Sequence, residues 1–230
     1  MKLSIQTIDH FEFSLHENST VSIITKRIFM DKKYKCILAS QSPRRKELMS
    51  WLNIPFEVIV SHAEEESSQT DPSLFAREIA QLKADAVAMR CDKNAFVISS
   101  DTIVVLGQKI YGKPRDTDDA RKILSELSNQ THEVITAVCF QYYVQDKKVQ
   151  LHFFDSTKVT FSHIDPVLME NYLLTKDSLD KAGAYGIQGP SLTFIKHLDG
   201  SYSNVVGFPL DKIVNELKKI FGENWQKCFV

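Results

Sequence analysis

Two carboxylates of this chain follow apolar runs that have the length and composition of buried strands. Glu65 comes shortly after the run 56–60, and Asp101 directly follows the run 95–100. Strand ends gather at one edge of an open α/β sheet, and Mg²⁺ takes one or two protein carboxylates together with water and phosphate oxygens. We therefore expect Glu65 and Asp101 to bind a divalent cation, Mg²⁺ or Mn²⁺. The alternative for Asp101 is a carboxylate that caps a turn through Thr102.

Two lysines are candidates to neutralise the charge that develops on a leaving phosphate. Lys113 is held between Gly112 and Pro114, which restricts its backbone and therefore the direction of its side chain. Lys83 lies beside the apolar stripe of an expected helix. Its alternative role is structural, with the aliphatic stem covering the edge of the core.

An anion site is predicted where the first apolar strand meets a helix. Ser42 is a natural N-cap and Pro43 suits the first helical position, so the first-turn amides would point out of the junction. Arg44 and Arg45 add planar donors that can bind phosphate oxygens in pairs, and Ser40 adds a hydroxyl. The alternative is an ordinary strand–loop–helix unit with surface arginines.

The elements that must position these residues alternate between strands and helices. Apolar alternation predicts strands over 35–39, 56–60, 95–100 and 193–197, a tight hairpin from 103–106 to 110–111, and a long antiparallel pair over 132–144 and 149–161. Helical spacing and start signals predict helices over 43–51, from Asp71-Pro72, from the acidic residues 116, 118 and 119, from Asp165-Pro166 and from Pro209. This order predicts a mixed α/β fold with strands on both sides of a cleft.

Composition narrows the class of protein. The 230 residues are 43% hydrophobic, enough for one domain or for two lobes that share a cleft. The formal net charge is −1, from 28 Lys+Arg and 29 Asp+Glu, which disfavours a nucleic-acid partner. Four widely spaced cysteines indicate neither a zinc site nor a disulfide framework, and no apolar run is long enough to span a bilayer. We expect a cytoplasmic, soluble protein without a membrane partner.

The sequence lacks several motifs of known enzyme classes, and no role is assigned to its N-terminal residues. There is no Walker loop and no nucleophile elbow, which disfavours a P-loop enzyme and a serine hydrolase. His132 and His163 lack metal-ligand spacing and are expected to be packed or surface histidines. Residues 1–33 form an N-terminal extension of unknown role, and residues 34–230 form the expected domain.

The region from about Tyr34 to about Leu217 resembles the Maf-type nucleoside triphosphate pyrophosphatases, once described as septum formation inhibitors. The segments that carry the resemblance are 40–48 (SQSPRRKEL), 100–102 (SDT), 112–116 (GKPRD), 131–132 (TH), 181–189 (KAGAYGIQG) and 201–210 (SYSNVVGFPL). A modest departure is Asn129, which stands where the family usually has glycine; asparagine tolerates a left-handed turn nearly as well.

The resemblance implies a Maf/inosine-triphosphatase-like fold, with a mixed twisted sheet, flanking helices and two lobes around a nucleotide cleft. It further implies metal-dependent hydrolysis of dTTP, UTP and modified pyrimidine nucleotides to the monophosphate and pyrophosphate. Asp101 matches the family's proton-acceptor aspartate. Acidic and basic active-site positions are matched by Glu65, Lys83 and Lys113. Positions associated with base selection in the dTTP/UTP branch are matched by Arg44, Thr102 and Gln188.

Other functions remain open at this level. One is a pyrophosphatase for 7-methylguanosine or purine triphosphates, which Arg44 and Gln188 disfavour because that branch differs at both places. Another is a cell-division regulator that acts through protein contacts. The sequence also leaves open whether the chain forms a homodimer, and which of the two carboxylates is the base.

Overall fold

The computed structural model describes residues 32–230, so all but two residues of the expected N-terminal extension lie outside the described part. The strands are β1 (Lys35–Leu38), β2 (Glu57–Val58), β3 (Ala95–Leu106), β4 (Lys109–Tyr111), β5 (Thr131–Val144), β6 (Lys147–Phe161) and β7 (Ile195–Asp199). The α-helices are α2 (Pro43–Ser50), α3 (Pro72–Ala88), α4 (Thr117–Leu127), α5 (Pro166–Leu174), α6 (Tyr202–Val206) and α7 (Leu210–Phe221). Three 3₁₀ turns are η1 (Ala182–Ala184), η2 (Pro190–Phe194) and η3 (Trp225–Cys228).

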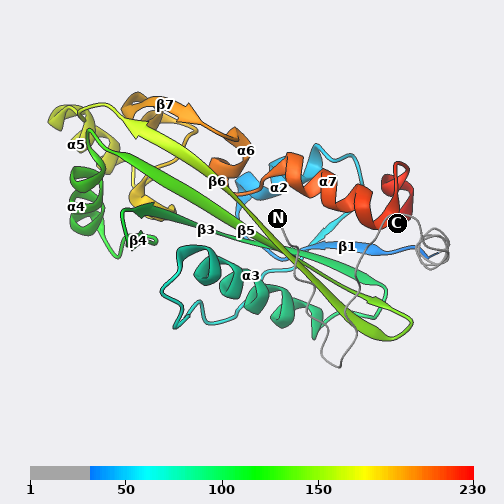
Figure 1. The fold of residues 1–230 in the computed structure, drawn as a ribbon. Coiled ribbons are helices and arrows are strands. Elements are labelled where there is room, and N and C mark those ends of the chain that lie inside the picture. The colour runs from blue at the N-terminus through cyan, green and yellow to red at the C-terminus, as the bar shows by residue number, and fades with distance from the viewer. Residues whose placement is uncertain (1–31) are drawn as a thin grey trace.

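A single mixed sheet organises the described residues. Its strand order is β2-β1-β3-β5-β6-β7, and β4 pairs with β3 off this path. The pairs of β1 with β2 and with β3 are parallel, and the remaining pairs are antiparallel. The long twisted strands β3, β5 and β6 run the length of the molecule, with helices at both ends and on both faces (Figure 1). The predicted α/β class, with a mixed twisted sheet and flanking helices, is confirmed.

Helix starts follow the side-chain signals of the sequence. Ser42, Asp71, Asp116 and Asp165 each accept a hydrogen bond from a first-turn amide of the helix that follows. Such caps satisfy amide groups that have no partner inside the helix. The expected starts of α2, α3, α4 and α5 are therefore confirmed.

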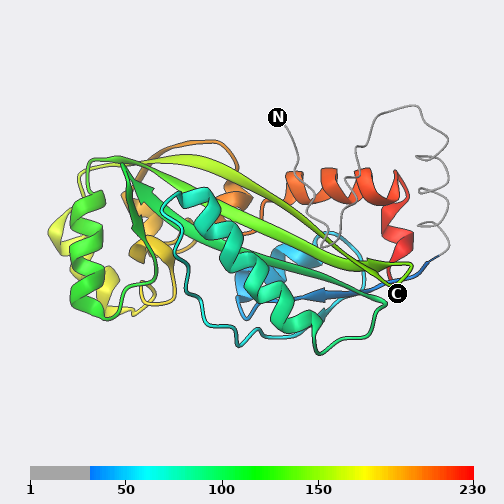
Figure 2. The ribbon, with the colours of Figure 1, turned by 60° about the horizontal axis from the view of Figure 1, so that its bottom comes forward.

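Helix α3 lies against one face of the sheet, whereas α2, α6 and α7 lie on the other (Figures 1 and 2). The face of α3 toward the sheet is built from small residues, because Ala76, Ala80 and Ala84 are all fully buried. Alanines let the helix backbone approach the strands closely, and Ser99 of β3 donates a hydrogen bond to the Ala80 carbonyl oxygen at 2.6 Å. This close contact also brings Lys83 against β3.

The structure corrects two boundaries. The sequence predicted that β3 would end near Ser100, but the strand runs unbroken from Ala95 to Leu106. Asp101 and Thr102 therefore lie inside a strand and not in a loop after one.

The link between β5 and β6 is only Gln145-Asp146, with φ values of 47° and 65°. This is the left-handed pair that a tight hairpin turn requires. Asn129 has a φ of 58°, which matches the expectation that it tolerates such a turn.

One edge of β3 is open at its centre. Strand β1 pairs with β3 only as far as Ile98, and β4 pairs with it only from Val104. Within residues 32–230, no strand pairs with 99–103 on this side. Successive side chains of a strand point to opposite faces, so residues from both faces can meet at an open edge. The open edge of β3 is where the site residues gather.

Two buried histidines predict a loss of stability in acid. Burial lowers the pKa of His132 and of His152 to about 4, from an ordinary value of 6.5. Between these values the unfolded chain binds more protons than the folded one, so the free energy of unfolding falls as the pH falls from about 6.5 towards 4. We expect each histidine to contribute ~2 kcal/mol to the loss between pH 7 and pH 5.

Urea unfolding at the two pH values measures this loss. His152→Gln removes one titrating group and should reduce the difference between the two pH values, whereas the exposed His197→Gln should not change it. An equal difference in wild type and His152→Gln would contradict the assignment.

Among the helices of residues 32–230, none combines the length and the apolar character that crossing a bilayer requires.

Candidate active site

A cavity of about 520 Å³ lies at the open edge of β3. Its volume is within the range of small-molecule sites. The residues that the sequence singled out, although far apart along the chain, all line it: Ser40, Ser42, Arg44, Arg45, Glu65, Lys83, Asp101, Thr102, Lys113 and Gln188. Their roles remain proposals, but the structure brings every one of them to the same place.

Glu65, Lys83 and Asp101 form a charged triad in the lining of the cavity. Lys83 Nζ lies 2.7 Å from Asp101 Oδ1 and 2.9 Å from Glu65 Oε2. The side chains of Lys83 and Asp101 are only 10% and 11% exposed, whereas that of Glu65 is 48% exposed. A buried carboxylate is costly without a partner, and Lys83 is the partner of Asp101. The triad thus gathers two carboxylates around one positive charge.

Arg45 makes contacts that the sequence did not indicate. Its Nε donates to the Gly207 carbonyl oxygen at 2.9 Å, its Nη1 to the Ser100 carbonyl oxygen at 2.8 Å, and its Nη2 to Thr102 Oγ1 at 2.9 Å. Burial lowers the pKa of Arg45, and the charges of Asp101 and Glu65 oppose that effect. Three of the five N–H groups of Arg45 therefore hold the open edge of β3 to the loop after α6.

Gly207 is required where Arg45 and Thr102 meet. Its φ is 106°, and a Cβ there would lie 2.9 Å from Thr102 Oγ1 and 3.2 Å from Arg45 Nε. The Thr102 hydroxyl also lies 3.0 Å from Thr136 Oγ1, which in turn donates to the Asn204 carbonyl oxygen at 2.8 Å. Because that bond uses the Thr136 proton, the Thr102 proton must be donated to Thr136. Thr102 is therefore fixed by hydrogen bonds from two sides.

The start of α2 forms the end of the cavity expected to bind anions. Ser40 Oγ accepts from the Ser42 amide at 3.1 Å, and Ser42 Oγ accepts from the Arg45 amide at 3.4 Å. The two hydroxyls thus fix the turn that leads into the helix. Arg44 lies at the rim with its side chain 25% exposed, and its Nη1 is 3.1 Å from Asp180 Oδ2.

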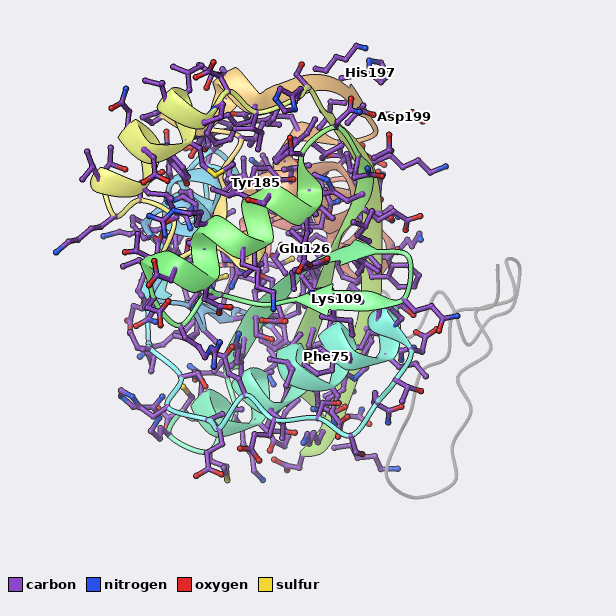
Figure 3. All side chains as sticks on the ribbon, turned by 90° about the vertical axis from the view of Figure 1, so that its left-hand side faces the viewer. Phe75, Lys109, Glu126, Tyr185, His197 and Asp199 are labelled. Carbon is purple, nitrogen blue, oxygen red and sulfur yellow. The ribbon has the colours of Figure 1, made fainter. Side chains whose placement is uncertain are left out.

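Another wall is formed by the loop after β4 and by the glycine-rich run, residues 182–189. Lys113 is exposed and Gln188 is half-buried. Phe75 of α3 and the buried Tyr185 also line the cavity. In Figure 3, these two aromatic residues lie on opposite sides of the strand that carries Lys109. The cavity therefore has apolar surfaces beside the charged triad.

Sequence reasoning gave no role to three residues of the wall, although two of them lie in the motif segment 181–189. Tyr185 lies within the glycine-rich run, and its hydroxyl is 2.7 Å from His132 Nε2, so His132 is a packed histidine, as expected. Asp180 and Lys181 directly precede that run and pair with each other at 2.7 Å. The acidic and basic residues at 177 and 181 have the spacing of a local ion pair, a signal that could have drawn attention to this segment.

The chemistry of the donor set is compatible with a hard divalent cation. Within the described residues, no group of three or more His, Cys, Asp or Glu side chains is placed to hold a metal. Two carboxylates, from Glu65 and Asp101, nevertheless converge on one cationic group. Mg²⁺ usually takes one or two carboxylates from a protein when phosphate oxygens and water supply its other ligands, so two carboxylates are sufficient.

Comparisons with known proteins give a consistent assignment. The family model described as "Maf-like protein" matches residues 35–220. A dTTP/UTP pyrophosphatase of Bacillus cytotoxicus is 42% identical over 186 residues, which cover 80% of this chain and 95% of that protein. A dTTP/UTP pyrophosphatase of Bacillus cereus is 41% identical over the same shares. A solved structure of a Vibrio cholerae protein is 12% identical, covers 80% of this chain and 97% of that one, and has a TM-score of 0.36. The chain belongs to the Maf family.

Proposed function

We propose that this protein is a dTTP/UTP pyrophosphatase, which hydrolyses a pyrimidine nucleoside triphosphate to the monophosphate and pyrophosphate in the cytoplasm. The observation that carries the proposal is the gathering of the Glu65–Lys83–Asp101 triad, Arg44 and Gln188 around one cavity. The 42% identity to a dTTP/UTP pyrophosphatase over nearly the whole of that relative supports the same substrate class.

Asp101 is the better candidate for the base. It lies on the long strand β3 and is 8% exposed, so its position is fixed, whereas Glu65 lies on an irregular exposed segment. Lys83 binds Asp101 through Oδ1, and Oδ2 can then accept the proton of the attacking water. The water oxygen forms a bond to the α-phosphorus, and the bond from that phosphorus to the α–β bridging oxygen breaks. Pyrophosphate leaves with the bonding electrons.

Glu65 and Asp101 would hold the divalent cation, Mg²⁺ or Mn²⁺. When bound, the cation would withdraw charge from phosphate oxygens and support the in-line displacement. The positive groups at the cavity would bind the rest of the polyanion: Lys113 from the loop after β4, Arg44, and the first turn of α2. Arg45 would contribute its positive charge from the lining of the cavity, because its hydrogen bonds already fix it to other protein groups.

Product analysis tests this proposal. Purified protein is incubated with dTTP, UTP, CTP, GTP, ATP and 7-methylguanosine triphosphate, with Mg²⁺ or Mn²⁺, and the products are separated by ion-exchange chromatography. We expect monophosphate and pyrophosphate in equal amounts from dTTP and UTP. Release of single phosphates would contradict pyrophosphatase chemistry. A preference for 7-methylguanosine or purine triphosphates would contradict the substrate class, and no turnover of any nucleotide would favour a purely regulatory protein.

Gln188 is expected to read the pyrimidine base. Its amide has both a donor and an acceptor, which can pair with the N3–H and O4 edge that uracil and thymine share, and cytosine inverts this edge. The wrong base leaves polar groups of the site unpaired, and the site therefore rejects it. The kcat/KM for UTP should thus exceed that for CTP by at least ~10-fold. Gln188→Ala should reduce this ratio towards one. Equal rates for CTP and UTP in wild type, or an unchanged ratio in the variant, would show that Gln188 does not select the base.

A further inference from the structure

Asp180 joins two walls of the cavity that come from distant parts of the chain. Its Oδ2 accepts from Arg44 Nη1 at 3.1 Å, and Arg44 belongs to α2. Asp180 itself lies in the segment between α5 and η1, just before the glycine-rich run that carries Gln188. The contact therefore links the helix expected to bind phosphate with the wall expected to read the base.

Lys181 holds Asp180 in place. Lys181 Nζ lies 2.7 Å from Asp180 Oδ1, 2.6 Å from Asp177 Oδ1 and 2.5 Å from the Asp177 carbonyl oxygen. An ammonium group has three N–H donors, so these contacts use all of them. The Lys181 side chain is only 5% exposed, and a Cβ at Gly186 would lie 2.8 Å from its Cε. Lys181 is thus packed in place and leaves Asp180 Oδ2 for Arg44.

The contact can contribute little to the stability of the fold. The side chains of Arg44 and Asp180 are 25% and 59% exposed, and exposed ion pairs contribute little because water screens them. The contact has a strong geometric effect, however. A guanidinium group is planar with five donors, so a carboxylate that holds one N–H restricts the plane and the directions of the others.

Charge favours keeping this contact when a nucleotide binds. Arg44, Lys181, Asp177 and Asp180 together carry no net charge. If Arg44 left Asp180 to bind phosphate alone, the remaining three groups would carry one negative charge at the rim of a cavity that receives a polyanion. Arg44 has further N–H donors, so it can hold Asp180 and the nucleotide at once.

We propose that Asp180 is a positioning residue for nucleotide binding, which orients Arg44 from another wall of the cavity while Lys181 holds Asp180 in place. This inference rests on the proposed function, because it requires Arg44 to contact the nucleotide. Asp180 does not touch the reacting atoms, and its effect passes through Arg44.

A double-mutant cycle tests the proposal. The kcat and KM for UTP are measured for wild type, Asp180→Ala, Arg44→Ala and the double variant. We expect Asp180→Ala to lower kcat/KM about 10-fold, mainly through KM, and to have less than a twofold further effect when Arg44 is already alanine. Thermal unfolding of each variant checks that the fold is retained, and little change is expected.

Asp177→Ala is the matched control. Within the described residues, Asp177 pairs with Lys181 but not with Arg44. We expect its kcat/KM to stay within about threefold of wild type. Equal losses for Asp177→Ala and Asp180→Ala, or an equal loss from Asp180→Ala in both Arg44 backgrounds, would overturn the proposal. So would an Asp180→Ala variant with wild-type kinetics, or an Arg44→Ala variant with wild-type kinetics.

Binding measurements separate this inference from the proposed function. Calorimetric titration with UTP, without divalent cation, measures a dissociation constant for wild type, the two single variants and the double variant. These four constants form the same cycle, whether or not the protein hydrolyses UTP. Coupling between Arg44 and Asp180 in binding without any turnover would retain the inference and reject the catalytic proposal. Turnover of UTP without coupling between Arg44 and Asp180 would retain the catalytic proposal and reject the inference.

Discussion

Asp101→Asn is expected to reduce kcat by ~10²-fold or more while the protein stays folded. The substitution keeps the shape of the side chain but removes the charge that Lys83 binds at 2.7 Å and the basicity that a water proton requires. KM for the nucleotide should change much less, because the phosphate-binding groups of α2 and the loop after β4 are untouched. Steady-state kinetics with dTTP and UTP measure both parameters.

The matched control is Asp199→Asn, an exposed aspartate on β7 that does not line the cavity. It should keep wild-type kinetics. Circular dichroism and thermal unfolding establish that Asp101→Asn folds. Turnover close to wild type in a folded Asp101→Asn protein would remove Asp101 from the mechanism, and Glu65 would then become the candidate base.

Lys83→Met is expected to lower kcat/KM by ~10²-fold or more. Among residues 32–230, the change removes the only positive group within 3 Å of both Asp101 and Glu65. Two neighbouring carboxylates would then lack their counter-charge at a site that must also receive a triphosphate. The free energy of unfolding should fall by ~1–3 kcal/mol, because a largely buried carboxylate loses its partner. Urea unfolding measures this cost separately from the kinetics.

Two further variants define the role of Lys83. Lys83→Arg retains the charge and should recover part of the lost activity. Lys122→Met, on the exposed face of α4, controls for the loss of a lysine elsewhere and should behave as wild type. If Lys83→Met kept its stability and stayed within about threefold of wild-type kcat/KM, the triad would not be part of the catalytic machinery.

The local elements could be predicted from the sequence because their signals are local. Ser42-Pro43, Asp71-Pro72 and Asp165-Pro166 place a capping oxygen and a proline at successive positions, and each pair starts a helix in the structure. The alternation of residues 132–144 and 149–161 likewise predicted the long pair of β5 and β6. Eight of the ten predicted site residues lie in the motif segments, whereas Glu65 and Lys83 were inferred from a strand end and a helical stripe, and all ten line the cavity.

The sequence alone did not determine how those residues meet. The predicted end of β3 near Ser100 was wrong because polar residues usually end a buried strand, and only the tertiary structure shows that Lys83 and Arg45 supply the partners that let Asp101 and Thr102 continue it. The open edge of β3 depends on where β1 ends and β4 begins. The contact between Arg44 and Asp180 joins residues 136 positions apart. Contacts at such separations leave no periodic signal in a single sequence, because they depend on how the elements pack together. The sequence thus determined the elements and the chemical groups of this protein, and the packing of α2, α3 and the glycine-rich run against one open strand edge decided which of those groups face one another.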